Sequence, residues 1–241
     1  MRITIASLSE NGGRPHNEDC IGCFSNDWSC CLALADGLGG HGKGEVASAA
    51  AIETVEIVSD APDCTLQEIF EDAQYNITDL QREANDFDSM KTTLVAVLIR
   101  ENIMQWGHIG DSRLYYFKNK ELKKRTLDHS VPQLLVESGE IKESEIRHHE
   151  DRNKLLRVLG TEWGEEPMYE LAEPVELDGD EQLLLCSDGF WEYITESQMT
   201  GILRNSSSPA EWLEKMETLI LYEGQNSYMD NYSAICAFIE K

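Results

Sequence analysis

Positive charge is scarce in this sequence. Its 241 residues include 20 Lys and Arg against 45 Asp and Glu, which gives a formal net charge of −25. Proteins that bind nucleic acid contact its phosphates through clusters of Lys and Arg, and the sequence has no such cluster. We therefore expect no nucleic-acid partner. The acidic composition is interpreted as the surface of a soluble cytoplasmic protein, and selection for a basic partner is the alternative.

Long apolar runs are also missing. No run approaches the roughly 20 residues that a helix needs to cross a bilayer, and the short apolar stretch after Arg2 does not follow the pattern of a signal peptide. No repeat, low-complexity tract or linker divides the sequence. We expect a single domain over residues 1–241, in the cytoplasm and without a membrane partner. It is expected to be a monomer, because no amphipathic seam is left unassigned.

Cysteine is too sparse for a disulfide scaffold, and the total of seven is odd. Cys20 and Cys23 form a C-x-x-C motif that is followed by the adjacent pair Cys30 and Cys31, so a zinc or redox site was considered. Adjacent residues of a strand point to opposite faces, which prevents tetrahedral convergence. Buried thiols are therefore expected. The other three cysteines also fit packing roles: Cys64, Cys186 and Cys236.

Five acidic residues lie in short motifs of unusual composition. They are Glu18 in RPHNED, Asp36 in DGLGGHG, Asp111 in GHIGDSR, Asp188 in LLLCSDGFW and Asp230 in DNYSAI. Three of them directly follow apolar runs, so carboxylates that are distant in sequence can converge at strand ends. Carboxylate oxygens suit Mg²⁺ or Mn²⁺. The pattern therefore predicts a metal site.

The hydrophobic periods predict both strands and helices. Strands are expected at 3–6, 28–35, 93–99, 103–108, 114–117, 182–186 and 234–239. Long helices are expected at 45–58, 66–84 and around 212–220, with short ones at 131–138 and 144–149. Strands early and late, with paired helices between and after them, favour two sheets packed face to face with helices outside.

Eight motifs in order resemble the metal-dependent Ser/Thr protein phosphatases of the PP2C (PPM) family, especially the compact bacterial type. They are RPHNED, DGLGGHGKGE, KTTL, GHIGDSRLYY, TLDHS, NKLLRVLG, LLLCSDGFW and DNYSAI. The resemblance covers about residues 5–239. It implies an α+β fold, a four-layer α-β-β-α sandwich of two antiparallel sheets flanked by helices. The excursion at about 131–153 takes the place of the family's flap beside the active site.

The same resemblance implies the metal ligands. Asp36 would bridge two Mn²⁺ or Mg²⁺ ions, Asp188 and Asp230 would hold one of them, and Glu18 with the Gly37 carbonyl would hold the other. Two such ions can share a water, lower its pKa and deliver hydroxide to phosphorus. The chemistry of phosphate-ester hydrolysis by itself also favours two cations held by carboxylates.

Further residues follow from the motifs. Arg14 matches the family's phosphate-binding Arg, whose planar guanidinium can bind two phosphate oxygens. Asp111 would hold a third metal together with Asp188, or else act as a structural acid that pairs with Arg113 or caps a turn. Asp19 and Asn231 are expected to orient ligands and metal waters. Five other polar residues are expected to make structural hydrogen bonds: Thr92, Thr93, Ser187, Asp128 and His129.

The loop after Asp36 departs from part of the family. Some members carry a His directly after the Asp-Gly, proposed as the general acid, and this sequence has Leu38 there. His41 in the same loop is an alternative proton donor, and a structural role for it is the other interpretation. A metal-bound water is a further candidate.

The predicted function is metal-dependent hydrolysis of phosphoserine and phosphothreonine on cytoplasmic proteins. The partners would be phosphorylated proteins and a bacterial Ser/Thr kinase that the enzyme opposes. The alternative is a catalytically silent pseudophosphatase that binds phosphoproteins or kinases. A partner-switching phosphatase acting on an anti-sigma antagonist is a closer rival. The complete set of carboxylates and Arg14 argues against the silent regulator.

Overall fold

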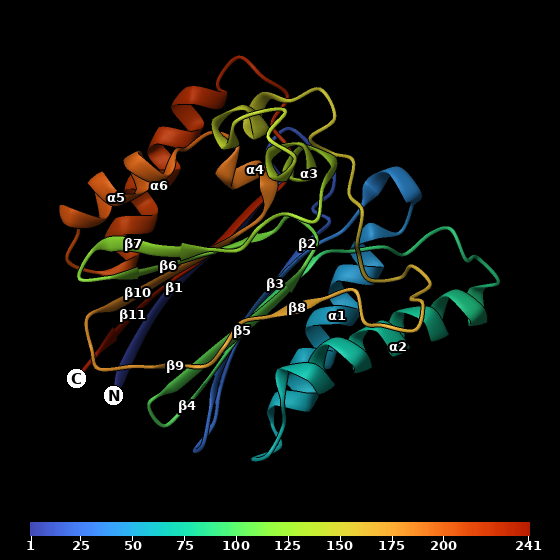
Figure 1. The fold of residues 1–241 in the computed structure, drawn as a ribbon, viewed down its shortest axis with the longest axis horizontal. Coiled ribbons are helices and arrows are strands. Elements are labelled where there is room, and N and C mark those ends of the chain that lie inside the picture. Colours follow the sequence, from blue (N-terminus) through green and yellow to red (C-terminus); the bar gives the residue numbers. More distant parts are fainter.

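The computed structural model describes residues 1–241, apart from the side chain of His41. Two antiparallel sheets lie face to face (Figure 1). Sheet A has the order β1 (Arg2–Glu10), β11 (Tyr232–Glu240), β10 (Glu181–Cys186), β6 (Arg113–Lys118) and β7 (Glu121–Arg125). Sheet B has the order β2 (Asp19–Ser25), β3 (Cys30–Asp36), β4 (Leu94–Arg100), β5 (Ile103–Ile109) and β8 (Glu170–Leu171), and β9 (Val175–Glu176) also pairs with β5.

Helices cover the outer face of each sheet. On sheet B lie α1 (Gly44–Ser59) and α2 (Leu66–Ala84), and on sheet A lie α5 (Glu196–Arg204) and α6 (Pro209–Gly224) (Figure 1). The predicted α-β-β-α sandwich is therefore confirmed. Shorter elements gather at the upper end in Figure 1: α3 (Val131–Glu137) and α4 (Asp188–Trp191). The remaining helical segments are 3-10 turns at Gly39–His41 and Glu143–His148.

Strand β3 is covered on both faces, which explains why its sequence is an almost continuous apolar run. Cys31 packs in the core beneath α1 and α2, whereas Cys30 packs in the core between the sheets. Both faces are covered, so neither needs polar side chains. The opposite orientation of these two thiols is as predicted. Cys23 is exposed, however, so the expectation of buried thiols is wrong for that residue, because its side of β2 lies near the sheet edge.

The long helices have local start and stop signals. Thr65 caps α2: its hydroxyl accepts the Glu68 N–H at 3.2 Å, and the Glu68 carboxylate accepts the Thr65 N–H at 2.7 Å. Asn85, in the left-handed region at φ 49°, ends the helix. The Ser208 hydroxyl caps α6 by accepting the Glu211 N–H, and Pro209 lies in the first turn.

Some elements differ from the prediction. The strand expected from residue 28 begins at Cys30, because the Asn26 side chain accepts the N–H groups of Trp28 and Ser29 and holds a turn. Six elements were not predicted from the sequence: β2, β7, β8, β9, α4 and α5. β7 (ELKKR) lies at a sheet edge and is mostly polar, so it carries little hydrophobic signal.

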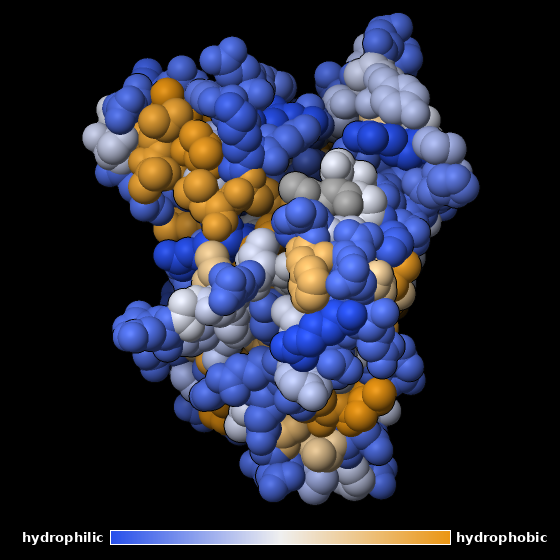
Figure 2. Space-filling model, turned by 90° about the vertical axis from the view of Figure 1, so that its right-hand side faces the viewer, coloured by the Kyte–Doolittle hydropathy of each residue, from blue (hydrophilic) through white to orange (hydrophobic). Residues whose placement is uncertain are grey.

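Much of the molecular surface is hydrophilic, with apolar side chains gathered mainly on one side of the upper part of the face drawn in Figure 2. In the described part of the chain, none of the helices has the length and apolar character needed to pass through a membrane.

Candidate metal centre

The acidic motifs meet at one end of the sandwich. A cleft of about 370 Å³ opens there, between the end of β3, the start of β11 and the turns after β5 and β10. Eight of the residues predicted from the sequence line it: Arg14, Glu18, Asp36, Gly37, Asp111, Asp188, Asp230 and Asn231. Leu38 also lines it. The side chain of His41, the alternative proton donor, lies outside the described residues.

Asp36 is the last residue of β3, and the neighbouring strand fixes its backbone. Its N–H donates to the Thr93 hydroxyl at 3.0 Å, and its carbonyl accepts the Thr92 hydroxyl at 2.9 Å. The Thr93 hydroxyl in turn lies 2.7 Å from that of Ser112. These buried contacts hold the carboxylate of Asp36 at the floor of the cleft.

The glycine loop allows Glu18 to approach. The Gly37 N–H donates to the Glu18 carbonyl at 3.0 Å, and the Ser48 hydroxyl donates to the same oxygen at 2.6 Å. A Cβ atom at Gly39 would lie 2.1 Å from Oε2 of Glu18. A side chain at Gly39 would therefore displace the Glu18 carboxylate from this position, whereas the backbone angles of Gly39 place no such restriction on the residue.

Asn231 connects two segments of the site, the loop between β1 and β2 and the start of β11. Its Oδ1 accepts the Glu18 N–H at 2.9 Å, while its Nδ2 donates to the carbonyls of Asn11 (3.0 Å) and His16 (2.9 Å). The side chain thus orients the loop before β2 relative to the start of β11. Its neighbour Asp230 accepts a hydrogen bond from Arg14 across the mouth of the cleft.

Asp19 lies beneath the cleft with one oxygen unpaired. The Ser187 hydroxyl donates to Oδ2 at 2.8 Å, and Oδ1 has no partner among the described residues. Burial, together with the nearby Asp188 and Asp230 carboxylates, raises the pKa of Asp19 to about 7. An unpaired buried carboxylate oxygen fits a missing hydrogen-bond donor, such as a water held by a cation.

The other carboxylates repel one another. Burial raises the pKa of Asp36 well above its ordinary value, and the neighbouring Asp19, Asp188 and Asp111 raise it further. The pKa values of Asp111 and Asp188 are raised for the same two reasons. Such a group is stable in its ionised form only with a cation. A donor set of carboxylate oxygens fits Mn²⁺ or Mg²⁺.

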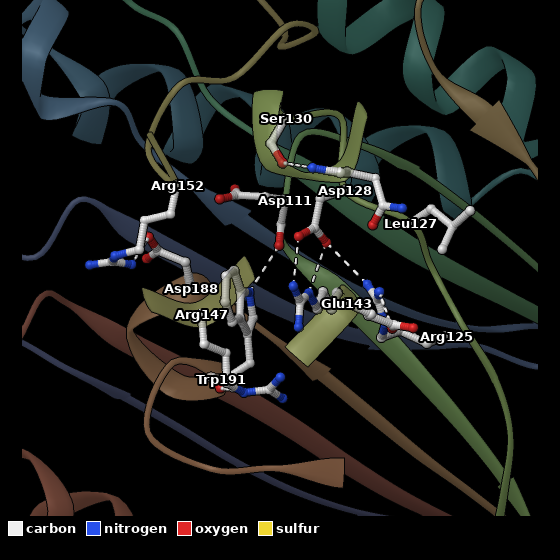
Figure 3. Close-up of polar contacts among 12 residues, drawn as sticks. Asp111, Arg125, Leu127, Asp128, Ser130, Glu143, Arg147, Arg152, Asp188 and Trp191 are labelled. Carbon is white, nitrogen blue, oxygen red and sulfur yellow. Dashed lines mark hydrogen bonds and ion pairs between the residues drawn. The ribbon is translucent and has the colours of Figure 1, made fainter. Parts of the chain in front are cut away.

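Arg152 is a charged neighbour of the site that the sequence analysis missed. Its Nη1 lies 3.3 Å from Oδ2 of Asp188 and its Nη2 lies 2.8 Å from Oε2 of Glu192 (Figure 3). Burial raises the pKa of Glu192 to about 7. Arg152 belongs to the excursion 131–153, where the sequence showed only a mixture of charges, and no local pattern indicated that it reaches the cleft.

Asp111 lies in the turn between β5 and β6, after Gly110 at φ +100°. The indole Nε1 of Trp191 donates to its backbone carbonyl at 3.0 Å (Figure 3). The alternative role predicted for Asp111, pairing with Arg113, is wrong. Arg113 instead makes two hydrogen bonds to the buried carboxylate of Asp128, at 2.8 and 2.6 Å.

His108, His129 and Glu170 form a second group whose ligand atoms lie within 4.8 Å of one another. The two rings stack at 4.6 Å. His108 Nε2 donates to the Leu127 carbonyl at 2.7 Å. His129 Nδ1 accepts the Gly110 N–H at 3.2 Å, so its proton is on Nε2, 3.2 Å from the Glu170 carboxylate. His108 Nε2 and His129 Nδ1 are thus engaged by backbone groups, whereas the buried Nε2 of His129 makes no hydrogen bond among the described residues.

The cleft combines groups that suit divalent cations with a group that suits phosphate. The two-sheet sandwich brings carboxylates from five segments and an arginine to one end, an arrangement suited to phosphate-ester chemistry with divalent cations. The sequence model described as "Protein phosphatase 2C" matches residues 10–225, and the chain belongs to this family.

Named relatives agree with the family. The serine/threonine phosphatase stp of Listeria monocytogenes (serotype 4b, strain F2365) is 33% identical over 82% of this chain and 81% of its own length. The crystal structure of the Mycobacterium tuberculosis serine/threonine phosphatase PstP/Ppp superposes with a TM-score of 0.84 and 31% identity, covering 99% of both chains. By family and relatives, the chain is a protein serine/threonine phosphatase.

A third comparison bears on the cofactor. The catalytic domain of the phosphatase PstP has been solved in complex with two manganese ions. That structure matches this chain with a TM-score of 0.82 and 29% identity, covering 99% of each.

Proposed function

We propose that this phosphatase hydrolyses phosphoserine and phosphothreonine of cytoplasmic proteins at the cleft described above, with two divalent cations, Mn²⁺ or Mg²⁺, as cofactors. One observation carries the proposal: the carboxylates of Asp36, Asp111 and Asp188 line a common cleft, where burial raises the pKa of each and other carboxylates raise it further. An arrangement of this kind costs stability unless cations occupy it, which is typical of a functional site.

Each acid has a distinct proposed role. Asp36 would be shared by the two cations. Asp188 and Asp230 would hold one of them, and Glu18 with the Gly37 carbonyl would hold the other. When bound, these ions would supply positive charge that activates water and stabilises the charge developing on the phosphoryl group. Asp111 would contribute, together with Asp188, to a third and weaker position.

Residues around the ligands complete the site. Arg14, at the mouth of the cleft, binds the phosphate oxygens of the substrate. Asp19 accepts hydrogen bonds from the water shell of the ions through its unpaired Oδ1. Asn231 keeps the Glu18 loop in place by the contacts given above.

The leaving alkoxide needs a proton, and Leu38 cannot supply one. His41 remains the candidate among the side chains of this loop, with a water of the metal centre as the alternative. If His41 is the donor, its replacement by Gln should lower kcat for alkyl phosphates. The kcat for aryl phosphates, whose acidic leaving groups need no proton, should stay unchanged.

The wider setting is proposed on the same basis. The 241 residues form one phosphatase domain that acts as a cytoplasmic monomer on phosphorylated proteins, and a Ser/Thr kinase supplies those substrates. The excursion 131–153 takes the position of a flap beside the cleft. Support for this position comes from Asn153 and Leu155, which line the cleft.

Hydrolysis of a phosphothreonine peptide by the purified protein tests the proposal, with Mn²⁺, Mg²⁺ or EDTA and with the Asp36→Ala variant alongside. We expect turnover that requires the metal and is lost in the variant. A folded protein that is inactive with every metal would instead be a silent regulator that binds phosphoproteins or kinases.

A further inference from the structure

Helix α4 is connected to two acids of the cleft. Asp188 is its first residue and lines the cleft, while Trp191, its last residue, donates its indole N–H to the carbonyl of Asp111, which also lines the cleft. Asp188 follows β10 of sheet A, whereas Asp111 lies in the turn from β5 of sheet B to β6 of sheet A, and the two acids share this four-residue helix as a common support. A small rotation of α4 would therefore move both acids relative to each other.

Arg147 holds the end of α4 from outside. It lies in the 3-10 turn at Glu143–His148, inside the excursion 131–153, and is 7% exposed. Its Nε donates to the Trp191 carbonyl at 3.1 Å. Its Nη2 donates to the Ile194 carbonyl at 3.1 Å and to Oε1 of Glu196 at 2.8 Å. Carbonyls at the end of a helix lack intrahelical donors, so the guanidinium supplies what α4 needs there.

The indole ring of Trp191 is also held by Arg113. The guanidinium of Arg113 lies 3.6 Å from the centre of the Trp191 ring, and Arg113 is itself held by two hydrogen bonds to the buried carboxylate of Asp128. Figure 3 shows Trp191 between Arg147 and Asp111. The support of Asp111 thus depends on a Trp191 that Arg147 and Arg113 both restrain.

We propose that Arg147 is a positioning residue of the metal centre. It fixes α4, and through it the relative placement of Asp188 and Asp111, so that docking of the excursion 131–153 sets the affinity of the cation position shared by these two acids. The inference rests on the metal roles proposed above for Asp111 and Asp188. Arg147 touches neither acid and acts only through the backbone and indole of Trp191.

The same 3-10 turn offers a matched control. Glu143, at its first residue, pairs with Arg125 of β7 and has no contact with α4. Glu143→Gln loosens the turn on the side of sheet A, whereas Arg147→Gln releases it on the side of α4. If the turn had only a structural role, the two variants would bind Mn²⁺ with the same affinity.

The experiment is an Mn²⁺ binding isotherm, read from the electron paramagnetic resonance signal of free Mn²⁺, for the wild type, Arg147→Gln and Glu143→Gln. We expect the weakest binding step to shift roughly tenfold in Arg147→Gln, as is usual when a group behind a metal ligand is removed. Glu143→Gln should match the wild type. Arg147→Lys is the second variant, to be used if Arg147→Gln fails to fold. It keeps the charge but cannot donate to both carbonyls and to Glu196 as a planar fork, so its weakest Mn²⁺ binding step should shift in the same direction.

Unchanged isotherms in the Arg147 variants, or an equal shift in Glu143→Gln, would overturn the proposal. The readout does not depend on turnover. A wild type that binds Mn²⁺ but hydrolyses no phosphopeptide would therefore contradict the proposed function and still test the role of Arg147. A parallel melting curve separates loss of metal affinity from loss of fold.

Discussion

Nη2 of Arg14 lies 2.8 Å from Oδ2 of Asp230, so the candidate phosphate-binding residue rests on a candidate metal ligand. A cation at Asp230 would compete for this carboxylate and leave the guanidinium available to a substrate phosphate. Metal binding and phosphate binding are therefore expected to support each other. Phosphate should bind more tightly when Mn²⁺ is present.

Arg14→Ala should raise KM for a phosphopeptide about tenfold or more and change kcat less, because a charge-assisted pair to phosphate is lost. Arg14→Lys should lie between, since a Lys cannot bind two oxygens as a planar fork. Steady-state kinetics and inhibition by inorganic phosphate measure both effects. Equal KM values in the wild type and Arg14→Ala would remove Arg14 from phosphate binding.

Asp36→Asn should abolish hydrolysis yet stabilise the metal-free protein. The substitution removes one of several mutually repelling buried carboxylates, and a gain of about 1 kcal/mol corresponds to roughly 2–4 °C in Tm for a domain of this size. Melting curves in EDTA measure the gain. Asp27→Asn, at an exposed acid outside the cleft, serves as the control and should change neither property.

Two neighbouring glycines should respond differently to the same change. A Cβ at Gly39 would collide with the Glu18 carboxylate at 2.1 Å, whereas a Cβ at Gly40 meets nothing within 4 Å. Gly39→Ala should therefore raise the half-saturating Mn²⁺ concentration, and Gly40→Ala should not. Similar metal dependence in the two variants would show that Glu18 is not held where the structure places it.

The buried pair of Arg113 and Asp128 should dominate the stability of its region. Both side chains are about 1% exposed. Asp128→Ala leaves a buried guanidinium with Arg125 as a like-charged neighbour, so we expect a loss of about 3–5 kcal/mol in urea unfolding. The double variant Arg113→Met, Asp128→Ala should recover part of that loss. A loss below about 1 kcal/mol in Asp128→Ala would contradict this expectation.

His129 should contribute a loss of stability in mild acid. Burial and the stacked His108 lower the pKa of His129 to about 4, while Glu170 acts in the opposite direction and Arg157 in the same one. The unfolded chain, with an ordinary His pKa near 6.5, binds the proton first. The contribution of His129 to stability is thus full above about pH 6.5 and declines as the pH falls toward 4. Because the raised pKa values of Asp19 and Asp36 act in the opposite direction in the metal-free protein, the quantity to measure is the difference between the Tm values of the wild type and His129→Asn, and we expect the wild type to lose stability relative to the variant as the pH falls.

Strands and helices were predicted well from the sequence where a single local pattern determines them. The unbroken apolar run of β3 indicated a strand covered on both faces, and the Thr65 to Asn85 segment carried its own cap, stripe and stop. β2 was missed because its sequence, DCIGCFS, contains a glycine and two polar ends that hide its period of two. Packing against α1 gives that strand its place, and this is a tertiary effect.

The acids of the cleft were found because each follows or precedes a strand and lies in a motif of unusual composition. Arg152 and Trp191 were not found. In the sequence, Trp191 is indistinguishable from an ordinary core aromatic residue. Only the folded structure shows that its indole N–H donates to the Asp111 carbonyl. Long-range partners of this kind leave no mark in the local sequence around either residue.

The pairing of β1 with β11 determines when this fold can be completed. Arg2 lies opposite Glu240, so the first strand to leave the ribosome has its hydrogen-bonding partner in the last strand described. Asp230 and Asn231, directly before β11, arrive equally late. During translation the nascent chain can assemble sheet B with its two helices, while sheet A still lacks a central strand. Catalytic competence is therefore expected only after β11 has been synthesised, and a product that stops before β11 should have no dephosphorylating activity.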